Sequence, residues 1–412
     1  MSAGNTTKPV IRKLSLEFSR DVYKDGVKMC ILPGKVLLQG VCCWPDDEGL
    51  RMKIVGWFLF WNLFVIEIFH ASYVFLNFND IGDAVDAGAT VTTTMEGLVR
   101  LHIMLTKKGV INSTLVKIWK QFWSLDVIEP VKRKKIKRQA QTAVMLTSIF
   151  LGSSIISNSQ ITGTPFIRNR GLVLKSVFPF DWRQYYFYEI IYIWQYYSDW
   201  FVLFMINAFD FFFIALVIIC SVQYVIMQEI FKYILTDESK RHRKIIFGER
   251  GETMTDREML FECLEQHKLL IGICNELESS FNIPILIQFF TSTCGICAAT
   301  LIMKVDYSQF SKMFTLVGAH ISQLFCYCYV GQHLAFESDY LAYAIYDCGW
   351  HIDYDRSFRK ALLLMMQRSQ RTQRLTAAGI TELDYASFLG ILRLSFSFYT
   401  LLNNLFMKNV GQ

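Results

Sequence analysis

Seven apolar stretches dominate this sequence, and each is long enough to cross a bilayer. A membrane-spanning helix needs about 20 mainly apolar residues. The stretches lie near 54–76, 84–104, 140–160, 188–222, 283–303, 313–333 and 384–407. They raise the hydrophobic fraction to 52% and exclude an ordinary soluble globule. The fold class we predict is an all-α membrane protein with seven transmembrane helices.

The distribution of Lys and Arg predicts the direction of these helices. Basic residues gather before the first stretch, in the run KRKKIKR at 132–138, and in the segments 223–282 and 335–383. Because such residues concentrate in cytosolic loops, we expect a cytosolic N-terminus and an extracellular C-terminus. The glycosylation patterns at Asn5 and Asn112 would then face the cytosol and stay unmodified. No nucleic-acid motif accompanies the basic runs, so we expect no nucleic-acid partner. The N-terminal segment does not resemble a cleavable signal peptide.

The segments between the later stretches are patterned as packed helices. The fourth stretch is too long for one crossing, so we expect it to continue into the cytosol as a helix. Residues after it repeat at alternating steps of three and four, which predicts a heptad seam. The seam comprises Leu260, Cys263, His267, Leu270, Cys274, Leu277 and Phe281. With the segment 335–383 it predicts a helical cytosolic anchor layer, packed either between subunits or within one. We expect His267 to be a packed core residue.

Charged residues inside the stretches favour structural pairing over catalysis. Glu96 and Arg100 lie one helical turn apart and can neutralise each other. Asp199 and Asp210 are expected to pair with neighbouring helices, because no partners for a proton relay are recognisable. Cys294 and Cys297 have no companion pair that would complete a metal site. We therefore predict no enzymatic activity, no cofactor and no metal.

The outer end of the fourth stretch is crowded with Tyr and Trp over 177–200. This crowding is typical of an interfacial aromatic belt, and it also suits the wall of an apolar pocket with a few polar groups. The second interpretation predicts a site for a small semi-volatile ligand. The ligand-binding residues it predicts are Thr90, Thr94, Ser148, Gly152, Ile155, Tyr188, Tyr192, Gln195, His320 and Gln323.

The last stretch has an unusual polar arc. Gly390, Arg393, Ser397, Thr400 and Asn404 fall on one side of a helix. Polar groups are unfavourable against hydrocarbon, so this side must face protein or water. It either bonds neighbouring helices or lines a pore built from several copies of the helix.

Four motifs in the C-terminal third resemble the insect odorant receptor family, in the family's order and spacing. They are AIYDCGW at 344–350, RKALLLMMQRSQ at 359–370, TAAG at 376–379 and SFSFYTLL at 395–402. Thr372 departs from the family, whose members often have proline there. The last helix lacks the ending of the related gustatory receptors.

The resemblance implies an odorant-tuned subunit of a ligand-gated, non-selective cation channel. Four subunits, including the common odorant receptor co-receptor, would surround one pore in the plasma membrane of a sensory dendrite. A small volatile odorant and membrane lipid would be the other partners. The implied pore-lining residues are Ser397, Thr400, Leu401, Asn403 and Asn404. Asn would hydrate a cation and Leu401 would close the pore by dewetting. Arg393 is expected to pair with an acid such as Glu382.

The resemblance also implies a division of the chain. Its parts are a cytosolic N-terminal segment (1–53), six helices with the ligand pocket and cytosolic extensions (54–334, with the extensions at 223–282), anchor helices (335–383), the pore-lining helix (384–407) and an extracellular tail (408–412). A metabotropic seven-helix chemoreceptor and a gustatory-type channel remain alternatives. A membrane enzyme or transporter would be expected to have inverted repeats, and none is recognisable.

Overall fold

Four long helices form the body of the molecule. The computed structural model describes residues 27–45, 49–77, 81–168, 171–351 and 355–410. The long helices are α6 (Pro130–Arg168), α7 (Tyr185–Tyr233), α10 (Asp256–Val305) and α11 (Phe310–Tyr346). A helix of the length of α10, at 1.5 Å per residue, spans about 75 Å, more than twice the ~30 Å hydrocarbon core of a bilayer. The predicted continuation of the fourth stretch as a single helix is confirmed by α7, which has 49 residues.

Three further helices complete the seven-helix fold. They are α3 (Leu50–Leu76), α4 (Ile81–Thr106) and α13 (Tyr385–Val410). Six of the seven are long and apolar enough to cross a membrane by length and composition. The seventh, α4, is less apolar because it contains Glu96 and Arg100. The predicted class, an all-α protein with seven long apolar helices, is confirmed, and the orientation of the termini stays a prediction.

Shorter elements connect these helices. They are η1 (Lys28–Ile31), α2 (Leu32–Gly40), α5 (Lys108–Gln121), η2 (Leu125–Val127), α8 (Glu238–Phe247), α9 (Glu249–Thr253), η3 (Tyr307–Gln309), α12 (Arg356–Ser369), β1 (Thr376–Ala377) and β2 (Thr381–Glu382). Their ends follow local sequence signals. Thr255 and Glu258 form a reciprocal capping box at the start of α10. Asp355 accepts a hydrogen bond from the Ser357 amide at the start of α12.

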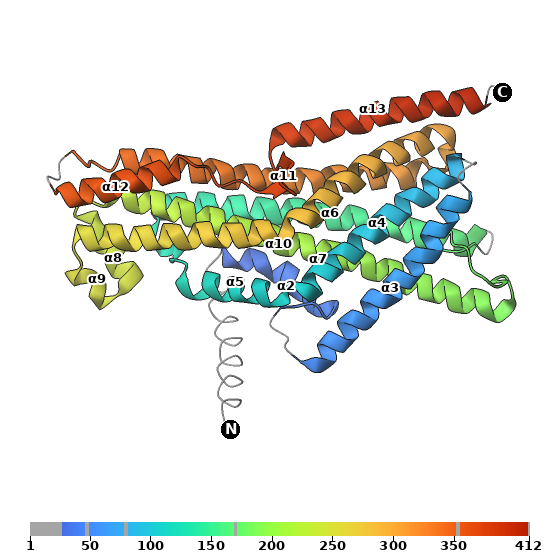
Figure 1. Ribbon diagram of the computed structural model, residues 1–412, viewed down its shortest axis with the longest axis horizontal. Helices are drawn as coiled ribbons and strands as arrows, with labels where there is room; N and C mark the ends of the chain where they lie inside the picture. Colours follow the sequence, from blue (N-terminus) through green and yellow to red (C-terminus); the bar gives the residue numbers. More distant parts are fainter. Residues whose placement is uncertain (1–26, 46–48, 78–80, 169–170, 352–354, 411–412) are drawn as a thin grey trace.

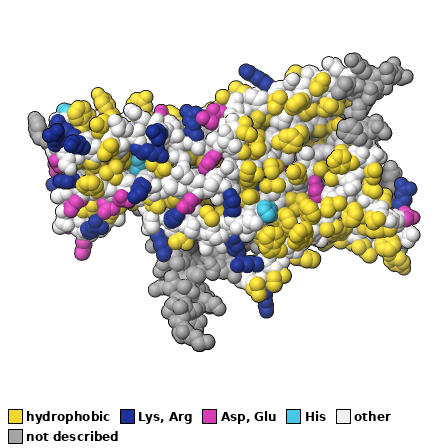
Figure 2. All heavy atoms as spheres, in the orientation of Figure 1, with side chains coloured by type: hydrophobic (Ala, Val, Ile, Leu, Met, Phe, Trp, Pro, Cys, Tyr) yellow, Lys and Arg dark blue, Asp and Glu magenta, His cyan; other side chains and the backbone are white. Residues whose placement is uncertain are grey.

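The surface divides along the long axis into a charged end and an apolar end. Charged side chains of both signs gather at the end that carries α8, α9 and α12, whereas hydrophobic side chains cover the visible face of the other end (Figures 1 and 2). On α3, for example, Phe58 is 67% exposed and Trp61 is 56% exposed. An apolar patch this large is unfavourable in water and suits hydrocarbon. The chain is therefore a multi-pass membrane protein whose charged end extends beyond the bilayer.

The predicted heptad seam lies on the buried face of α10. All seven of its residues are buried, and they pack in the core within one chain. The ring of His267 packs edge-on against Tyr224 of α7, which confirms the expected core role of this histidine. Of the two alternatives for this seam, packing within one subunit is the one observed.

A small hairpin connects α12 to α13. Strands β1 and β2 pair antiparallel, and the turn between them places Ala378 and Gly379 at positive φ. The Ala378 amide donates to the Asn282 carbonyl of α10, which docks the hairpin on the bundle. On α11, Gly331 allows the hairpin's exit to approach closely. A Cβ at this glycine would lie 2.3 Å from the Cβ of Leu383.

Candidate functional site

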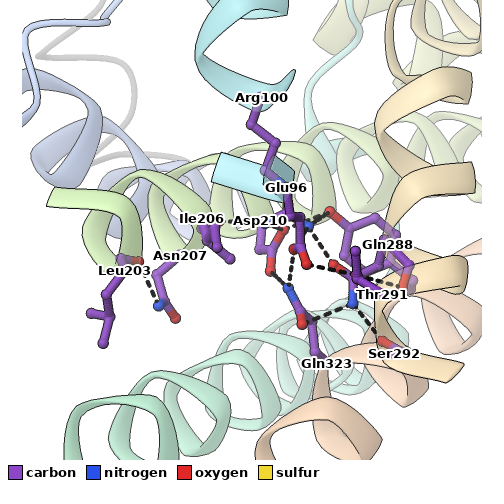
Figure 3. A network of polar contacts seen from close by, with 11 residues as sticks. Glu96, Arg100, Leu203, Ile206, Asn207, Asp210, Gln288, Thr291, Ser292 and Gln323 are labelled. Carbon is purple, nitrogen blue, oxygen red and sulfur yellow. Dashed lines mark hydrogen bonds and ion pairs between the residues drawn. The ribbon is translucent and has the colours of Figure 1, made fainter. Parts of the chain in front are cut away.

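A buried ion pair network lies in the apolar end, where α4, α7, α10 and α11 meet. Arg100 is fully buried, and its guanidinium lies 2.7 Å from Glu96 and 2.7 Å from Asp210 (Figure 3). The predicted neutralisation of Glu96 by Arg100 is confirmed, and so is the predicted interhelical pairing of Asp210. With all three groups ionised, the network keeps one negative charge in excess.

Neutral side chains complete the hydrogen bonding of these charges. Tyr327 donates to Asp210 at 2.5 Å, and Gln323 donates to the other oxygen of Asp210 at 2.7 Å. Thr291 donates to Glu96 at 2.8 Å, and Gln288 accepts from Arg100 at 2.6 Å. Figure 3 shows these groups converging from separate helices. We call the three charged residues and these four neutral ones the Arg100 cluster. Its bonds fix the relative positions of four helices, because the Arg100 guanidinium on α4 contacts groups on α7, α10 and α11.

A cavity of about 80 Å³ lies beside the Arg100 cluster, between α4, α6, α7 and α11. Glu96 and Gln323 of the cluster form part of its wall. Phe150, Ile161 and Leu203 provide apolar lining. An engineered protein cavity of about 150 Å³ accepts benzene, so this one has room for a ligand of only a few heavy atoms.

Among the polar side chains that line this cavity, four each carry one buried atom that has no hydrogen-bonding partner among the described residues. These atoms are Ser157 Oγ, Asn158 Nδ2, Asp199 Oδ2 and Asn207 Oδ1. Asn158 of α6 lies beside the Asp199 carboxyl of α7. Asn207 uses its amide nitrogen to bond the Leu203 carbonyl (Figure 3). We call these four residues the cavity polar group.

Three of the sequence-predicted ligand residues line this cavity. They are Thr90 on α4 and His320 and Gln323 on α11. Thr90 also bonds the buried His70 of α3 at 3.0 Å. Thr94, one turn further along α4, is buried and donates to the Thr90 carbonyl. The ligand-binding role of all these residues stays a prediction.

Three other predicted residues contact backbone near the N-terminal end of α7. Gln195 exchanges two hydrogen bonds with the backbone of Leu174, and Tyr192 donates to the Thr162 carbonyl at 2.7 Å. Tyr188 is buried and its hydroxyl lies 3.4 Å from the Gly171 carbonyl. The structure therefore places these aromatic and amide groups where they hold the end of α6 and the segment after it against α7.

The predicted residues on α6 occupy a different side of the helix from the cavity lining. Ser148 and Gly152 are exposed, and Ile155 is half-buried. The face toward the cavity instead carries Ser157 and Asn158. The signal for these two was the polar run SSIISNSQ at 153–160, which is unusual inside an apolar stretch. The ligand-binding role of the predicted set stays a prediction.

The last helix, α13, lies on the outside of the bundle (Figure 1). Ser397, Thr400, Leu401 and Asn404 are exposed on it. Thr400 donates to the Ser397 carbonyl of its own helix. Asn403 accepts a hydrogen bond from Lys304 of α10 at 2.8 Å. Apart from Asn403, the predicted pore-lining residues therefore make no recorded side-chain bond to another helix of this chain among the described residues.

The expected pairing of Arg393 with Glu382 is wrong. Glu382 lies on β2 and pairs with Arg374 at the start of the hairpin, while Arg393 is exposed on α13. The pairing expected from the sequence does not form because the hairpin turns Glu382 toward Arg374, just before β1. Among the described residues, Cys294 and Cys297 are free thiols, and no group of metal-binding side chains is present there.

Comparisons with known proteins agree with this architecture. The family model of the 7tm odorant receptor matches residues 80–396. Two Drosophila melanogaster proteins are similar over shorter regions. Odorant receptor 85c is 28% identical over 36% of this chain and 39% of its own length. Odorant receptor 33b is 32% identical over 34% of this chain and 38% of its own length. The alignments thus span about two fifths of these relatives.

Solved structures show the same fold over nearly the whole chain. The insect olfactory receptor OR5 from Machilis hrabei, in complex with eugenol, superposes with a TM-score of 0.77 and 12% identity. The superposition covers 92% of this chain and 98% of that receptor. At this identity the likeness establishes the fold alone. The family match covers well over half of the sequence, and the chain therefore belongs to the 7tm odorant receptor family, as its C-terminal motifs predicted.

Proposed function

We propose that this protein is the odorant-tuned subunit of a ligand-gated, non-selective cation channel in the plasma membrane of sensory dendrites. A small volatile ligand binds in the cavity beside the Arg100 cluster and opens the channel. The subunit works in a tetramer with the odorant receptor co-receptor. The observation that carries this proposal is the cavity itself, which is bordered by four helices in the apolar end of a chain of this family. The matched receptor's complex with eugenol is consistent with such a site.

The cavity is well placed to influence helix packing. It shares Glu96 and Gln323 with the Arg100 cluster, which bonds α4, α7, α10 and α11 together. A ligand shifts a conformational equilibrium only by the difference in its affinity for the two states. Occupancy of the cavity favours whichever arrangement of these helices makes room for the ligand. Movement of α10 and α11 then reaches α13, which packs on both.

The exposed polar arc of α13 supports a shared pore. A single copy leaves Ser397, Thr400 and Asn404 uncovered. Such groups are unfavourable against lipid, so in the assembly they face water or a neighbouring subunit. Asn404 offers an amide oxygen to a passing cation, and the neighbouring Leu401 closes the path by dewetting. In this proposal the charged end, with α8, α9 and α12, is the cytosolic anchor that stays in place.

The test is whole-cell current in cells that express this chain with the co-receptor, under a broad odorant panel. We expect an odorant-evoked cation current that persists when G-protein cycling is blocked inside the cell. Silence across the panel, despite surface labelling of this chain, would contradict the channel proposal. A current abolished by the G-protein block would instead identify a metabotropic receptor.

A variant of the closing residue sharpens the test. Leu401→Ala shortens the apolar side chain at the narrowest point and should raise the current that flows without odorant. Leu389→Ala is the matched control, because Leu389 is exposed on α13 outside the polar arc. Equal basal currents in both variants would exclude Leu401 as the closing residue.

A further inference from the structure

The cavity polar group is an exception to a general pattern of folded proteins. Nearly all buried polar atoms have a hydrogen-bonding partner, and an exception calls for an explanation. Ser157 is 3% exposed and Asn158 is 8% exposed, yet neither Ser157 Oγ nor Asn158 Nδ2 has a partner among the described residues. Both line the same cavity as the Asp199 carboxyl. Their common feature is the space they face, which indicates that an occupant completes them.

The charge around the cavity indicates the sign of that occupant. The Arg100 cluster already has one carboxylate more than it has cations. When ionised, Asp199 adds a second negative charge, and none of the described residues that line the cavity is Lys or Arg. Water could fill the space and bond the orphaned atoms, but water would leave this excess charge uncompensated. A cation with N–H donors would compensate the charge and bond the orphaned acceptors Asp199 Oδ2 and Ser157 Oγ.

The remaining groups near the cavity do not supply that cation. At the outer ends of neighbouring elements, Lys175 and Lys312 both pair with Asp86, at 3.0 Å and 3.6 Å. His320 is the one imidazole in the lining. Its ring packs against Gly295 of α10, so closely that a Cβ there would meet Nε2 at 2.5 Å. For an ionised Asp199, the compensating charge must therefore come from outside the described residues of the chain.

Two neighbouring orphaned acceptors, Asp199 Oδ2 and Ser157 Oγ, match the donors of an ammonium group. Such a group carries three N–H donors and no acceptor. Asp199 Oδ2 and Ser157 Oγ can accept, while Asn158 can turn its amide nitrogen to the same carboxylate. Hydrogen bonds between an ammonium and a carboxylate are short and strong, which offsets the loss of hydration. Asn207 lies about two turns deeper on α7, so a different part of a ligand would have to reach it.

We propose that the cavity selects a small protonated alkylamine, whose ammonium binds between Asp199, Asn158 and Ser157 and whose alkyl chain lies against Phe150, Ile161 and Leu203. The proposal rests on the proposed function only in taking this cavity as the ligand site. The volume of about 80 Å³ limits the ligand to a chain of a few carbons. An amine with a pKa near that of lysine, about 10.4, is cationic at neutral pH.

The first experiment compares n-butylamine with n-butanol, which has the same chain and nearly the same size. Binding is measured as thermal stabilisation of the purified full-length receptor over a concentration series at pH 7. We expect the midpoint concentration for the amine to be about 10- to 100-fold lower, the range of a charge-assisted hydrogen bond. Equal midpoints, or tighter binding of the alcohol, would overturn the proposal without any variant.

Variants then test which residue produces the preference for the amine over the alcohol. Asp199→Asn should abolish the preference for the amine. Asp181→Asn is the matched control, because Asp181 is an exposed acid just before α7 that only bonds the Arg183 amide. Asn158→Leu keeps the cavity's charge and should reduce the preference less than Asp199→Asn does. A preference that survives in a folded Asp199→Asn receptor, or one lost equally in the control, would refute the assignment.

Current recordings with the same two ligands separate this inference from the proposed function. Amine-selective binding without any current would leave the ligand assignment intact and contradict the channel. Currents evoked equally by the alcohol and the amine would support the channel and contradict amine selection. Amine-selective currents that require Asp199 would support both.

Discussion

Two polar clusters lie next to each other in the apolar end, and they differ in how completely their carboxylates are bonded. Asp210 belongs to the Arg100 cluster and has an arginine, a tyrosine and a glutamine as partners. Asp199, about three turns away on the same helix, has an oxygen with no partner among the described residues. In the Arg100 cluster every carboxylate oxygen is bonded without a ligand, although Arg100 Nε has no partner among the described residues, and the cluster holds helices together. In the cavity polar group an oxygen of the Asp199 carboxylate lacks a hydrogen-bonding partner among these residues, and in our proposal a ligand supplies one.

The largest effect is expected from removing the central cation of the Arg100 cluster. Arg100→Met leaves two buried carboxylates without compensation, and breaking a buried pair in this way costs about 3–5 kcal/mol. We expect loss of the folded receptor, measured as thermal unfolding in detergent and as surface expression. Lys240→Met removes an exposed cation paired with Asp237 and should change neither. A stable Arg100→Met receptor would show that the cluster is not a structural centre.

A smaller loss is expected when one bond of the Arg100 cluster is removed. Tyr327→Phe deletes the hydroxyl that donates to Asp210 in the fully buried cluster. Hydrogen bonds to charged groups contribute about 1.5–3 kcal/mol, so the free energy of unfolding should fall by that order. Tyr340→Phe, at an exposed position of α11, is the control. An unchanged melting temperature would mean that water or another group replaces the hydroxyl.

Removing a polar group from the cavity polar group should instead raise the stability of the unliganded receptor. Asn158→Leu replaces a buried amide nitrogen that has no partner with apolar surface of similar size. Burying an unsatisfied group is unfavourable, so the unliganded receptor should gain about 1 kcal/mol of stability. Ser159→Ala is the control, because Ser159 is exposed and bonds its own helix. Destabilisation by Asn158→Leu would show that the amide has a structural partner, and the contrast between the clusters would disappear.

The smallest effect concerns a third buried polar group, far from both clusters. His242 in α8 is buried at the charged end, and burial lowers its pKa below the ordinary 6.5, against the opposing influence of Glu238 and Glu229. The unfolded chain then takes up a proton before the folded one does. Stability should be constant above about pH 6.5 and decline as the pH falls from there toward the folded pKa.

Replacing this histidine tests that dependence. His242→Gln should flatten the decline of melting temperature below about pH 6.5. His351→Gln is the control, since His351 is exposed. An identical pH profile in both variants would assign the decline to other groups.

The sequence predicted those features that depend on spacing along one helix. The pair Glu96–Arg100 and the seam from Leu260 to Phe281 are separated by single turns or heptads, so periodicity alone placed them. The seven-helix class followed in the same way from length and hydropathy. Such patterns are local, and tertiary structure did not alter them.

The cavity could not be predicted in this way. Small polar residues occur on several sides of α6, including Ser148 and Ser157, so the sequence gives no preference for the side that faces α7. The two hydrogen bonds of Gln195 to the Leu174 backbone depend on how the segment after α6 folds back. No periodic pattern in the sequence predicts this fold-back. The partner of Glu382 was missed for the same reason, because a hairpin brings Arg374 to it.

The hairpin before α13 has a mechanical consequence. It fixes the base of the helix where Leu383 packs against Gly331, whereas most of the helix surface above it is exposed. A helix of this length measures about 39 Å, so a tilt of about 5° at the base displaces its far tip by about 3 Å. The hydrogen bond between Lys304 and Asn403 restrains that tip. Among the described residues, α13 is thus held at its base by the hairpin and restrained further along by the Lys304–Asn403 bond, so small tilts at the base become larger displacements at its C-terminal end.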